Sequence, residues 1–399
     1  MKIVQVIADA GPGGAPVHVR DLIRGLATLP NKSDLILIAP PGWLAEEVRD
    51  LATICPVNFP NAWANQIQTE LADAIQRFWE ETEKPPLLHF HGVRAGIAGR
   101  LALEKRWPNQ RLPVIYTEHL WTANYHLPSR LRELAQLHLL RRCDRLTSKT
   151  IAVSHAVADF LLAKKITTPE KLVVIPHGVA LPGRTKSGAG ILNIGVRDKI
   201  ALDSRFPIPD TKNATKVSYR LGTIGSLVPL KGYRYLIEAM PLILQNLPQT
   251  VLEIIGEGPE HHRLADQIRH LGLNEHVRLL GSGATLNLAD KCASWDIFVS
   301  SSLSESFGLA IAEAMAAGCP VVATRVGAVP ELVTNETGRL VAPRDSHELA
   351  KAITDLLPRA ETLRQLGTAG RAQIANRFRL TEMVNQTATL YQEVFGSAV

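Results

Sequence analysis

The stretch Ser300-Ser-Ser-Leu-Ser-Glu305-Ser-Phe-Gly-Leu-Ala-Ile-Ala-Glu313 runs from small polar residues into a segment of good helix formers. Glu305 and Glu313 are eight residues apart, which is a little over two turns of an α-helix. A helix that started near Glu305 would place both carboxylates close to one face. The Ser-Phe-Gly sequence favours a later start, so we predict Glu305 on the loop before the helix and Glu313 one to two turns inside it.

Between the two glutamates, the backbone amides of Phe307, Gly308 and Leu309 would then form a helix N-terminus. Such an N-terminus binds anions well, because its amides point outward and the helix dipole favours negative charge. Two acceptor carboxylates on either side of an anion site suit a ligand with a phosphate in its middle and hydroxyls at both ends. A nucleotide sugar has that shape.

Size and composition narrow the class of protein. A chain of 399 residues is too long for one ordinary core, so two domains are expected. With 46% hydrophobic and 21% charged residues, the composition is that of a soluble globular protein. A net charge of +6 is compatible with an anionic substrate or membrane surface and too weak to indicate nucleic acid as a partner.

The four cysteines are widely spaced and form no C-x-x-C pair, which argues against a disulfide framework or a structural zinc site and for a reducing compartment. No apolar run reaches the width of a bilayer. The N-terminal segment Lys2–Asp9 is too short and too soon acidic for a signal peptide. We therefore expect a cytoplasmic protein, at most peripheral to the inner face of the membrane.

Short apolar runs alternate with segments of helical periodicity through the whole sequence. Strands that are almost continuously apolar are typical of parallel sheets covered on both faces. Two successive series of them predict an α/β protein of two doubly wound, Rossmann-like domains. The first series is Ile3–Ile7, Leu35–Ile38, Leu87–His91, Val114–Tyr116, Thr150–Val153 and Leu172–Ile175, and the second is Tyr219–Ile224, Val251–Ile255, Val277–Leu280, Ile297–Ser300 and Pro320–Ala323.

The boundary between the domains is expected at Leu181–Arg220, a stretch rich in Gly, Pro, Lys and Asp without a sustained period. This gives a first domain over 1–180, a linker or small insertion with a hairpin over 181–218, a second domain over 219–377 and a C-terminal helix within 378–399. Because ligands bind at the carboxyl ends of parallel strands, the natural site is the cleft between the two domains.

Three glycine-rich turns follow expected strands. Gly13 and Gly14 allow backbone amides to approach a phosphate, although an ordinary turn would look the same. Lys231 stands beside a glycine at a strand–helix turn and can reach a pyrophosphate, or can simply be solvated. Gly256 opens a sequence similar to a dinucleotide fingerprint, but the third glycine is replaced by His261, so we interpret it as a tight turn at a ligand-facing strand end.

Histidines also lie at strand ends. His89 and His91 alternate along one expected strand, and His119 follows the next in Tyr116-Thr-Glu-His119. A metal site needs three convergent ligands. Separate polar roles are favoured, so no metal is expected; His119 either hydrogen-bonds a sugar hydroxyl or has a structural role.

Taken together, these residues resemble the glycosyltransferases of family 4, which have the two-Rossmann GT-B fold. The resemblance covers nearly the whole chain, and its most specific part is the E-x7-E motif formed by Glu305 and Glu313. The other parts follow in family order: Gly13-Gly14 with His18, His91-Gly92, His119, Ile175-Pro-His177-Gly178, Lys231-Gly232, Gly256-Glu-Gly258-Pro259 and Leu280-Gly281. The C-terminal helix also looks like the one that crosses back onto the first domain in this fold.

The resemblance implies a retaining, metal-independent transfer of a hexosyl group from a UDP- or GDP-linked sugar to an acceptor hydroxyl, with no cofactor. It implies catalytic roles for His119, Lys231 and Glu305, and acceptor contacts for His18 and His91. Glu313 would bind the ribose, Glu305 the hexose, and Leu280 would lie near the base. The full set of implied donor-binding residues is Gly13, Gly14, Ser226, Lys231, Gly256, Leu280, Glu305, Phe307, Gly308, Leu309 and Glu313.

One position departs from the family pattern. Ser226 stands where family members usually carry an arginine beside the pyrophosphate, and a serine offers one neutral hydrogen bond in place of a charged fork. Another cation such as Arg325 replaces it, or the helix dipole and amides suffice, or the leaving group is stabilised less. A catalytically silent nucleotide-sugar-binding subunit and a sugar epimerase of the same fold are the alternative functions.

The segment Ser129–Lys171 carries an excess of basic residues. A solvated helix face explains this excess, and contact with an anionic membrane surface explains it as well. The second explanation suggests a lipid-linked acceptor, with a sugar acceptor as the other class.

Overall fold

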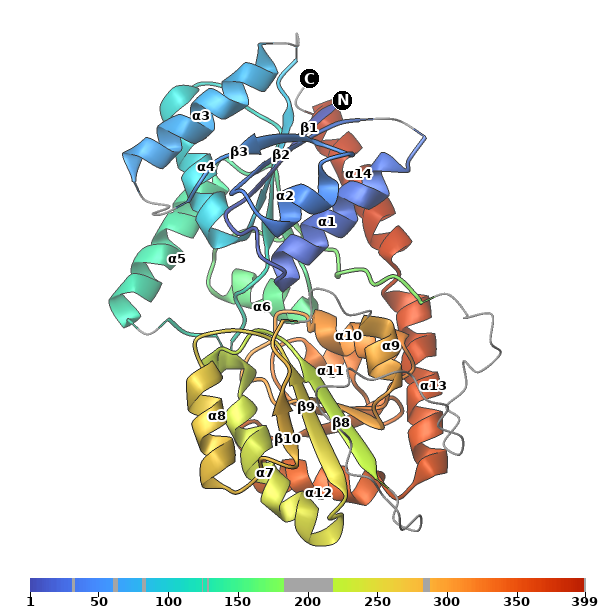
Figure 1. Ribbon diagram of the computed structural model, residues 1–399. Helices are drawn as coiled ribbons and strands as arrows, with labels where there is room; N and C mark the ends of the chain where they lie inside the picture. The colour runs from blue at the N-terminus through green and yellow to red at the C-terminus, as the bar shows by residue number, and fades with distance from the viewer. Residues whose placement is uncertain are drawn as a thin grey trace.

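The computed structural model describes residues 1–30, 33–59, 64–80, 84–123, 125–127, 129–182, 218–282 and 288–397. Within them, two sheets form two lobes (Figure 1). The strands of the first sheet are β1 (Lys2–Ile7), β2 (Asp34–Ala39), β3 (Thr53–Pro56), β4 (Leu87–His91), β5 (Val114–Glu118), β6 (Lys149–Ala152) and β7 (Leu172–Val174), and those of the second are β8 (Tyr219–Ile224), β9 (Thr250–Ile255), β10 (Val277–Leu279), β11 (Ile297–Ser300), β12 (Val321–Thr324) and β13 (Gly338–Val341).

The strands of the two sheets are connected in the same pattern, and the first sheet has one strand more. The order is β3-β2-β1-β4-β5-β6-β7 in the first and β10-β9-β8-β11-β12-β13 in the second, and the pairs are parallel. Most strand residues are buried because helices cover both faces of each sheet. The predicted fold class, two doubly wound parallel domains, is therefore confirmed.

The sequence analysis missed two strands, β3 and β13. Each is the last strand at one edge of its sheet and is only four residues long. Thr53 and Pro56 are exposed in β3, and Arg339 is half-buried in β13, so neither strand shows the continuous apolar run of the central strands.

Helices follow the strands in both lobes. Side chains of Ser129, Ser154 and Asp345 cap three of them by accepting a backbone N–H. The helices of the first lobe are α1 (Gly14–Ala27), α2 (Trp43–Val48), α3 (Asn65–Trp79), α4 (Gly92–Arg106), α5 (Arg130–Asp144) and α6 (His155–Ala163). Those that follow are η1 (Pro229–Lys231, a 3-10 turn), α7 (Tyr233–Asn246), α8 (His261–His270), α9 (Leu288–Ala293), α10 (Leu309–Ala316), α11 (Val329–Leu332), α12 (Ser346–Leu356), α13 (Ala360–Arg377) and α14 (Leu380–Ser397).

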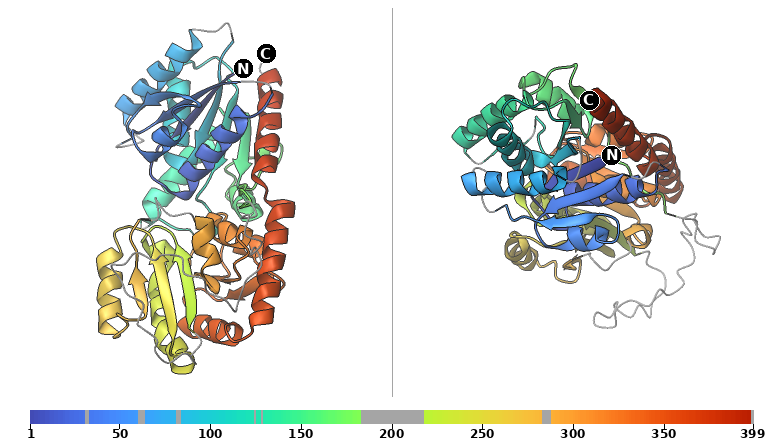
Figure 2. Two further views of the ribbon diagram at one scale, coloured as in Figure 1. Left: turned by 45° about the vertical axis from the view of Figure 1, so that its right-hand side comes forward. Right: turned by 90° about the horizontal axis from the view of Figure 1, so that it is seen from above.

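The C-terminal helices join the two lobes. Helix α13 packs on α10 in the second lobe, and α14 continues along the first lobe against α1 (Figures 1 and 2). At the crossing, Val179 N–H donates to the carbonyl of Phe378, and Leu380 N–H donates to the carbonyl of Val179. Met383, Val384 and Val394 of α14 belong to the core of the first lobe. The predicted crossing of the C-terminal helix is confirmed.

The two lobes also share apolar contacts. One buried cluster extends from Phe90 and Trp121 in the first lobe to Phe307 and Ile311 in the second. The predicted linker falls mostly on 183–217, outside the described residues, so its boundaries and its hairpin stay predictions. Among the helices that the structure describes, none combines the length and the apolar character that crossing a membrane requires.

A close approach in the second lobe gives a stability prediction. A Cβ on Gly222 of β8 would lie 1.8 Å from Cδ2 of the buried Trp295, whose indole N–H donates to Glu253. The ring therefore occupies the space of a side chain. Gly222→Ala should lower the free energy of unfolding by about 1–3 kcal/mol, as overpacking of a core does.

Urea denaturation measures this change. Gly396→Ala is the matched control, because a Cβ there meets nothing within 4 Å and alanine is the better helix former. Equal stability of the two variants would contradict the proposed packing.

Candidate active site

The site begins where two neighbouring strands of the second sheet end. The turn η1 follows β8, and the loop 301–308 follows β11. Leu303 N–H donates to the carbonyl of Leu230 at 2.7 Å, and Ser301 Oγ donates to the carbonyl of Lys231 at 3.0 Å. Gly232 has φ +61°, and a Cβ on it would lie 2.1 Å from the carbonyl oxygen of Ser301. Glycine thus allows the two loops to touch.

This contact joins two predicted site residues, Lys231 and Glu305. Lys231 Nζ lies 2.6 Å from Glu305 Oε1, and Ser302 Oγ donates to the same carboxylate oxygen at 2.7 Å. The side chains are 27% and 13% exposed, so the ion pair is partly shielded from water. A shielded charge keeps more of its electrostatic effect on a ligand than a surface lysine would.

Helix α10 starts as predicted. Gly308 is its N-cap with φ +97°, and the helix begins at Leu309. Glu305 lies on the loop before the helix, and Glu313 lies just over one turn inside it. The pKa of Glu313 is raised to about 7, first by burial and then by the neighbouring carboxylate of Asp21.

The N-termini of α1 and α10 meet. Gly13 is the N-cap of α1, and a Cβ on Gly14, the first helical residue, would lie 3.6 Å from Leu309 Cδ1. Each N-terminus carries amides without helical partners and a partial positive charge. Lys231 lines a pocket together with Ala310 in the first turn of α10, so a cation and helix N-termini form a site suited to a diphosphate.

The first lobe holds the loop that carries Glu305. Thr122 Oγ1 and Ser304 Oγ form a hydrogen bond of 3.0 Å, and Ser154 Oγ donates to the carbonyl of Ser306 at 2.6 Å. These bonds lie directly before and after Glu305 in the chain. The position of this glutamate therefore depends on both lobes.

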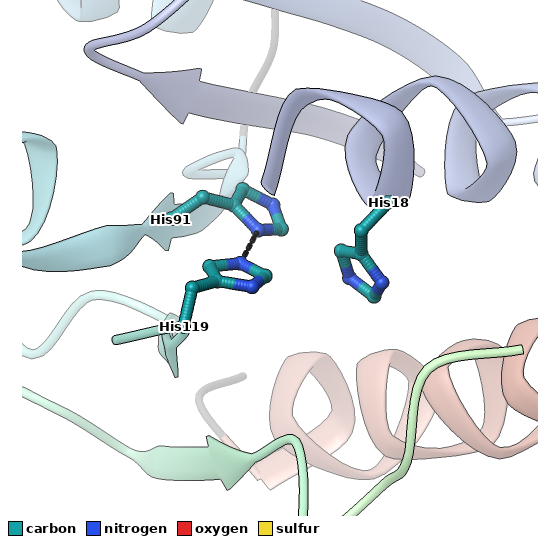
Figure 3. Close-up of side chains that lie close together, drawn as sticks. All are labelled: His18, His91 and His119. Atoms are coloured by element: carbon teal, nitrogen blue, oxygen red, sulfur yellow. Dashed lines mark hydrogen bonds between the residues drawn. The ribbon is translucent and has the colours of Figure 1, made fainter. Parts of the chain in front are cut away.

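Histidines from separate elements of the first lobe gather where this lobe faces the second. His91 Nδ1 lies 3.2 Å from His119 Nε2, and the ring centroid of His18 is 5.1 Å from that of His119 (Figure 3). His177 Nδ1 lies 2.8 Å from His18 Nδ1, and its ring packs edge-on against Phe307 of the second lobe. We predicted separate polar roles, whereas the structure brings the rings into one cluster at the lobe interface.

Burial keeps the cluster uncharged. Desolvation lowers the pKa of His18 to about 3 and lowers the pKa of His91, His119 and His177 well below the usual value. The neighbouring imidazoles lower the pKa of His91 further, because each would repel a second positive charge.

The sequence analysis missed the polar chain behind this cluster. Gln5 Nε2 donates to the hydroxyl of Tyr391, which is hydrogen-bonded to His89 Nδ1, while the side-chain oxygen Oε1 of Gln5 accepts from His91 Nε2 at 2.7 Å. His91 is thus protonated on Nε2, and its Nδ1 lone pair points to His119. A single glutamine inside the apolar strand β1 is the one sequence feature that could have indicated this polar chain. Nothing in the sequence around Tyr391 of α14 indicates its role.

The other predicted donor residues lie along the same sheet edge. Gly256 N–H donates to the carbonyl of Gly281 at 2.7 Å, and Leu280 N–H donates to Ile254, so both residues are at the carboxyl ends of β9 and β10. Ser226 is exposed directly after β8. Phe307 buries its side chain and can offer only its backbone to a ligand. The roles of all these residues stay predictions.

Two protein-family models match the chain. The model described as Glycosyltransferase Family 4 matches residues 12–181, and the model described as Glycosyl transferases group 1 matches residues 207–373. The two matches follow one another and together span most of the sequence, one on each lobe.

Relatives with assigned names agree with these models. N-acetyl-alpha-D-glucosaminyl L-malate synthase of Bacillus anthracis is 25% identical over 351 residues, which is 76% of this chain and 89% of the relative. A GDP-mannose-dependent alpha-(1-6)-phosphatidylinositol monomannoside mannosyltransferase of Mycobacterium tuberculosis is 32% identical over 187 residues, 43% of this chain and 49% of the relative.

Experimental structures with a similar fold are known. Anabaena Alr3699/HepE in complex with UDP-glucose superposes with a TM-score of 0.76 at 22% identity, covering 98% of this chain and 100% of the other. At that identity the likeness supports the fold. With both halves matched by their models, this chain belongs to glycosyltransferase family 4 and is a retaining, GT-B-fold hexosyltransferase that uses a nucleotide sugar as donor.

Proposed function

We propose that this chain transfers a hexosyl group from a UDP- or GDP-linked sugar to a hydroxyl of a sugar or lipid-linked acceptor, and that the donor lies between the N-termini of α1 and α10. One observation carries the proposal: the ion pair of Lys231 and Glu305 lines one pocket together with Ala310 in the first turn of α10, the helix whose first residue, Leu309, contacts Gly14. Cationic and acceptor groups are thus arranged around an anion site, as a nucleotide sugar requires.

In this arrangement, the diphosphate is held by Lys231 and by the amides of Gly14, Gly308 and Leu309. Glu313 accepts from the ribose hydroxyls, which places the nucleoside along α10 toward Leu280. Glu305 then lies at the hexose end, on the other side of the diphosphate. His119 faces the hexose from the first lobe and offers an imidazole nitrogen to its C6 hydroxyl.

The chemistry follows from this placement. Negative charge builds on the departing diphosphate in the transition state while the sugar becomes oxocarbenium-like. Groups that already point at that charge lower the barrier without reorganising. Glu305 holds Lys231 in position in advance, Ser302 donates to Glu305, and the first lobe fixes the loop of Glu305 through Ser304 and Ser306. Positioning and electrostatic stabilisation therefore carry the reaction.

The first test removes the cation. Lys231→Ala should lower kcat by about 10²–10³, as removal of a single stabilising donor does. Initial rates at saturating donor measure the effect. Lys351→Ala, an exposed lysine on α12, is the control and should retain the parental rate. A Lys231 variant with the parental kcat would refute the assignment.

The second test uses the pKa of Glu313. Without donor, this pKa is about 7, so near pH 7 about half of the chains carry a protonated Glu313. Ribose hydroxyls that donate to the carboxylate favour its charged form and lower the pKa. Donor binding at pH 7 should therefore release up to about half a proton per chain.

Calorimetry in buffers of different ionisation enthalpy measures this release. It should disappear in Glu313→Gln, and it should disappear for the parental chain at alkaline pH, where the carboxylate is already ionised. Equal release by the parental chain and Glu313→Gln would show that the ribose contact lies elsewhere.

Helix α5 supports a lipid-linked acceptor. Leu131 and Leu134 are 80% and 56% exposed, and their spacing places them on one helix face. Arg130 and Arg132 flank Leu131 and are exposed as well. Apolar and cationic side chains together at one helix end suit the surface of an anionic membrane. A relative named for a phosphatidylinositol monomannoside is consistent with an acceptor of this class.

Vesicle flotation tests this surface. The parental chain should float with anionic phosphatidylglycerol vesicles at low salt and not with neutral phosphatidylcholine vesicles. Leu131→Gln with Leu134→Gln should reduce flotation, whereas Leu271→Gln, at a 38% exposed leucine of the second lobe, should not. Failure of the parental chain to bind anionic vesicles would overturn the membrane contact.

A further inference from the structure

The histidine cluster has the composition of a metal site. His18 comes from α1, His91 from the end of β4 and His119 from the residue after β5. One ring nitrogen of each lies within 4.8 Å of one nitrogen of both others, and Figure 3 shows the three rings turned toward a common space. His18 and His91 are buried, and His119 is half-buried.

The rings are ready to act as ligands. A metal binds neutral imidazole, and protons otherwise have to leave first. His18, His91 and His119 lie at the lobe interface with little exposure to water, which disfavours the charged form of an imidazole. The ring nitrogens His91 Nδ1 and His119 Nε2 lie 3.2 Å apart, and two neutral rings at that distance do not repel one another by charge.

The surroundings orient these rings. The side-chain oxygen of Gln5 accepts a hydrogen bond from His91 Nε2, which directs the Nδ1 lone pair of His91 into the cluster. His177 Nδ1 lies 2.8 Å from His18 Nδ1. Metal-binding histidines are held in this way by a partner on the second ring nitrogen. His119 Nδ1 is buried and lacks a hydrogen-bond partner among the described residues, so the cluster contains one unsatisfied nitrogen.

We propose that His18, His91 and His119 bind a divalent transition-metal ion, with Zn²⁺ as the best match. Imidazole suits zinc, copper and nickel, and three histidines with an open fourth position are a known zinc arrangement. The ion is not part of glycosyl transfer. With the donor placed as proposed above, the ion occupies the ring nitrogen that His119 offers to the hexose, so metal binding and transfer compete.

The competition rests on the proposed function, because it requires His119 to contact the hexose. The binding of the ion does not rest on it. Each part therefore has its own experiment, and one can fail without the other.

Binding is measured by calorimetry with ZnCl₂ on chelator-treated protein without a polyhistidine tag. The adjacent surface residues His261 and His262 are both changed to Gln in every sample, because they form a second pair of histidine rings. We expect one Zn²⁺ per chain. His18→Gln and His91→Gln should each weaken binding at least about 10-fold, and His155→Gln, an exposed histidine on α6, should not. No saturable binding, or equal affinity in all variants, would overturn the site.

A variant beyond the ligands distinguishes a built site from chance contact. Gln5→Met removes the side-chain oxygen that accepts from His91 Nε2 and leaves all three proposed ligands in place. It should weaken zinc affinity about 10–100-fold. Thermal melting checks that this variant folds. Unchanged zinc affinity in a folded Gln5→Met chain would show that His91 is not a ligand.

Competition is measured with donor and acceptor present. Zinc should raise the apparent KM for the donor, a chelator should reverse the effect, and Gln5→Met should require about 10–100-fold more zinc for the same inhibition. Zinc binding without inhibition would refute the competition and leave the site intact. Transfer without zinc binding would leave the proposed function intact and refute the site.

Discussion

In both sheets, the order of winding reverses once, between β1 and β4 and between β8 and β11. At such a reversal, the loops after the two central strands diverge to opposite faces and leave a crevice at the strand ends. Several residues of the site come from these crevices. His18 lies on α1, which follows β1, and His91 ends β4, while Lys231 and Glu305 follow β8 and β11. The order of the strands thus determines which residues lie close together, whatever their chemistry.

Electrostatics then explain why the site favours an anion. The N-terminus of α10 contacts that of α1 and shares a pocket with the cation of Lys231, while Glu313 lies one turn further along α10 with a pKa raised to about 7. In the proposed arrangement, a diphosphate binds the first group and ribose hydroxyls bind the second. We propose that these N-termini contribute at the position where Ser226 replaces the arginine usual in the family.

The first lobe has a different character. At the lobe interface it presents a cluster of neutral imidazoles, and a buried chain through Gln5 and Tyr391 fixes the tautomer of His91. Tyr391 belongs to α14, the helix that returns from the second lobe. The crossing helix therefore contributes more than a connection between lobes, since it supplies a polar group behind the active site.

The sequence by itself determined the two parallel sheets, because almost continuous apolar strands can be buried only in such a fold, and it placed Glu305 and Glu313 correctly around the start of α10. It missed β3 and β13, whose edge positions remove the apolar pattern. Only the tertiary structure decided that Lys231 pairs with Glu305, that Gly14 meets Leu309, and that His18, His91 and His119 form one cluster. These contacts join residues far apart in the chain, and neither propensity nor periodicity encodes the distance between two strand ends. Family resemblance named several of these residues, but the packing of the two lobes brought them together.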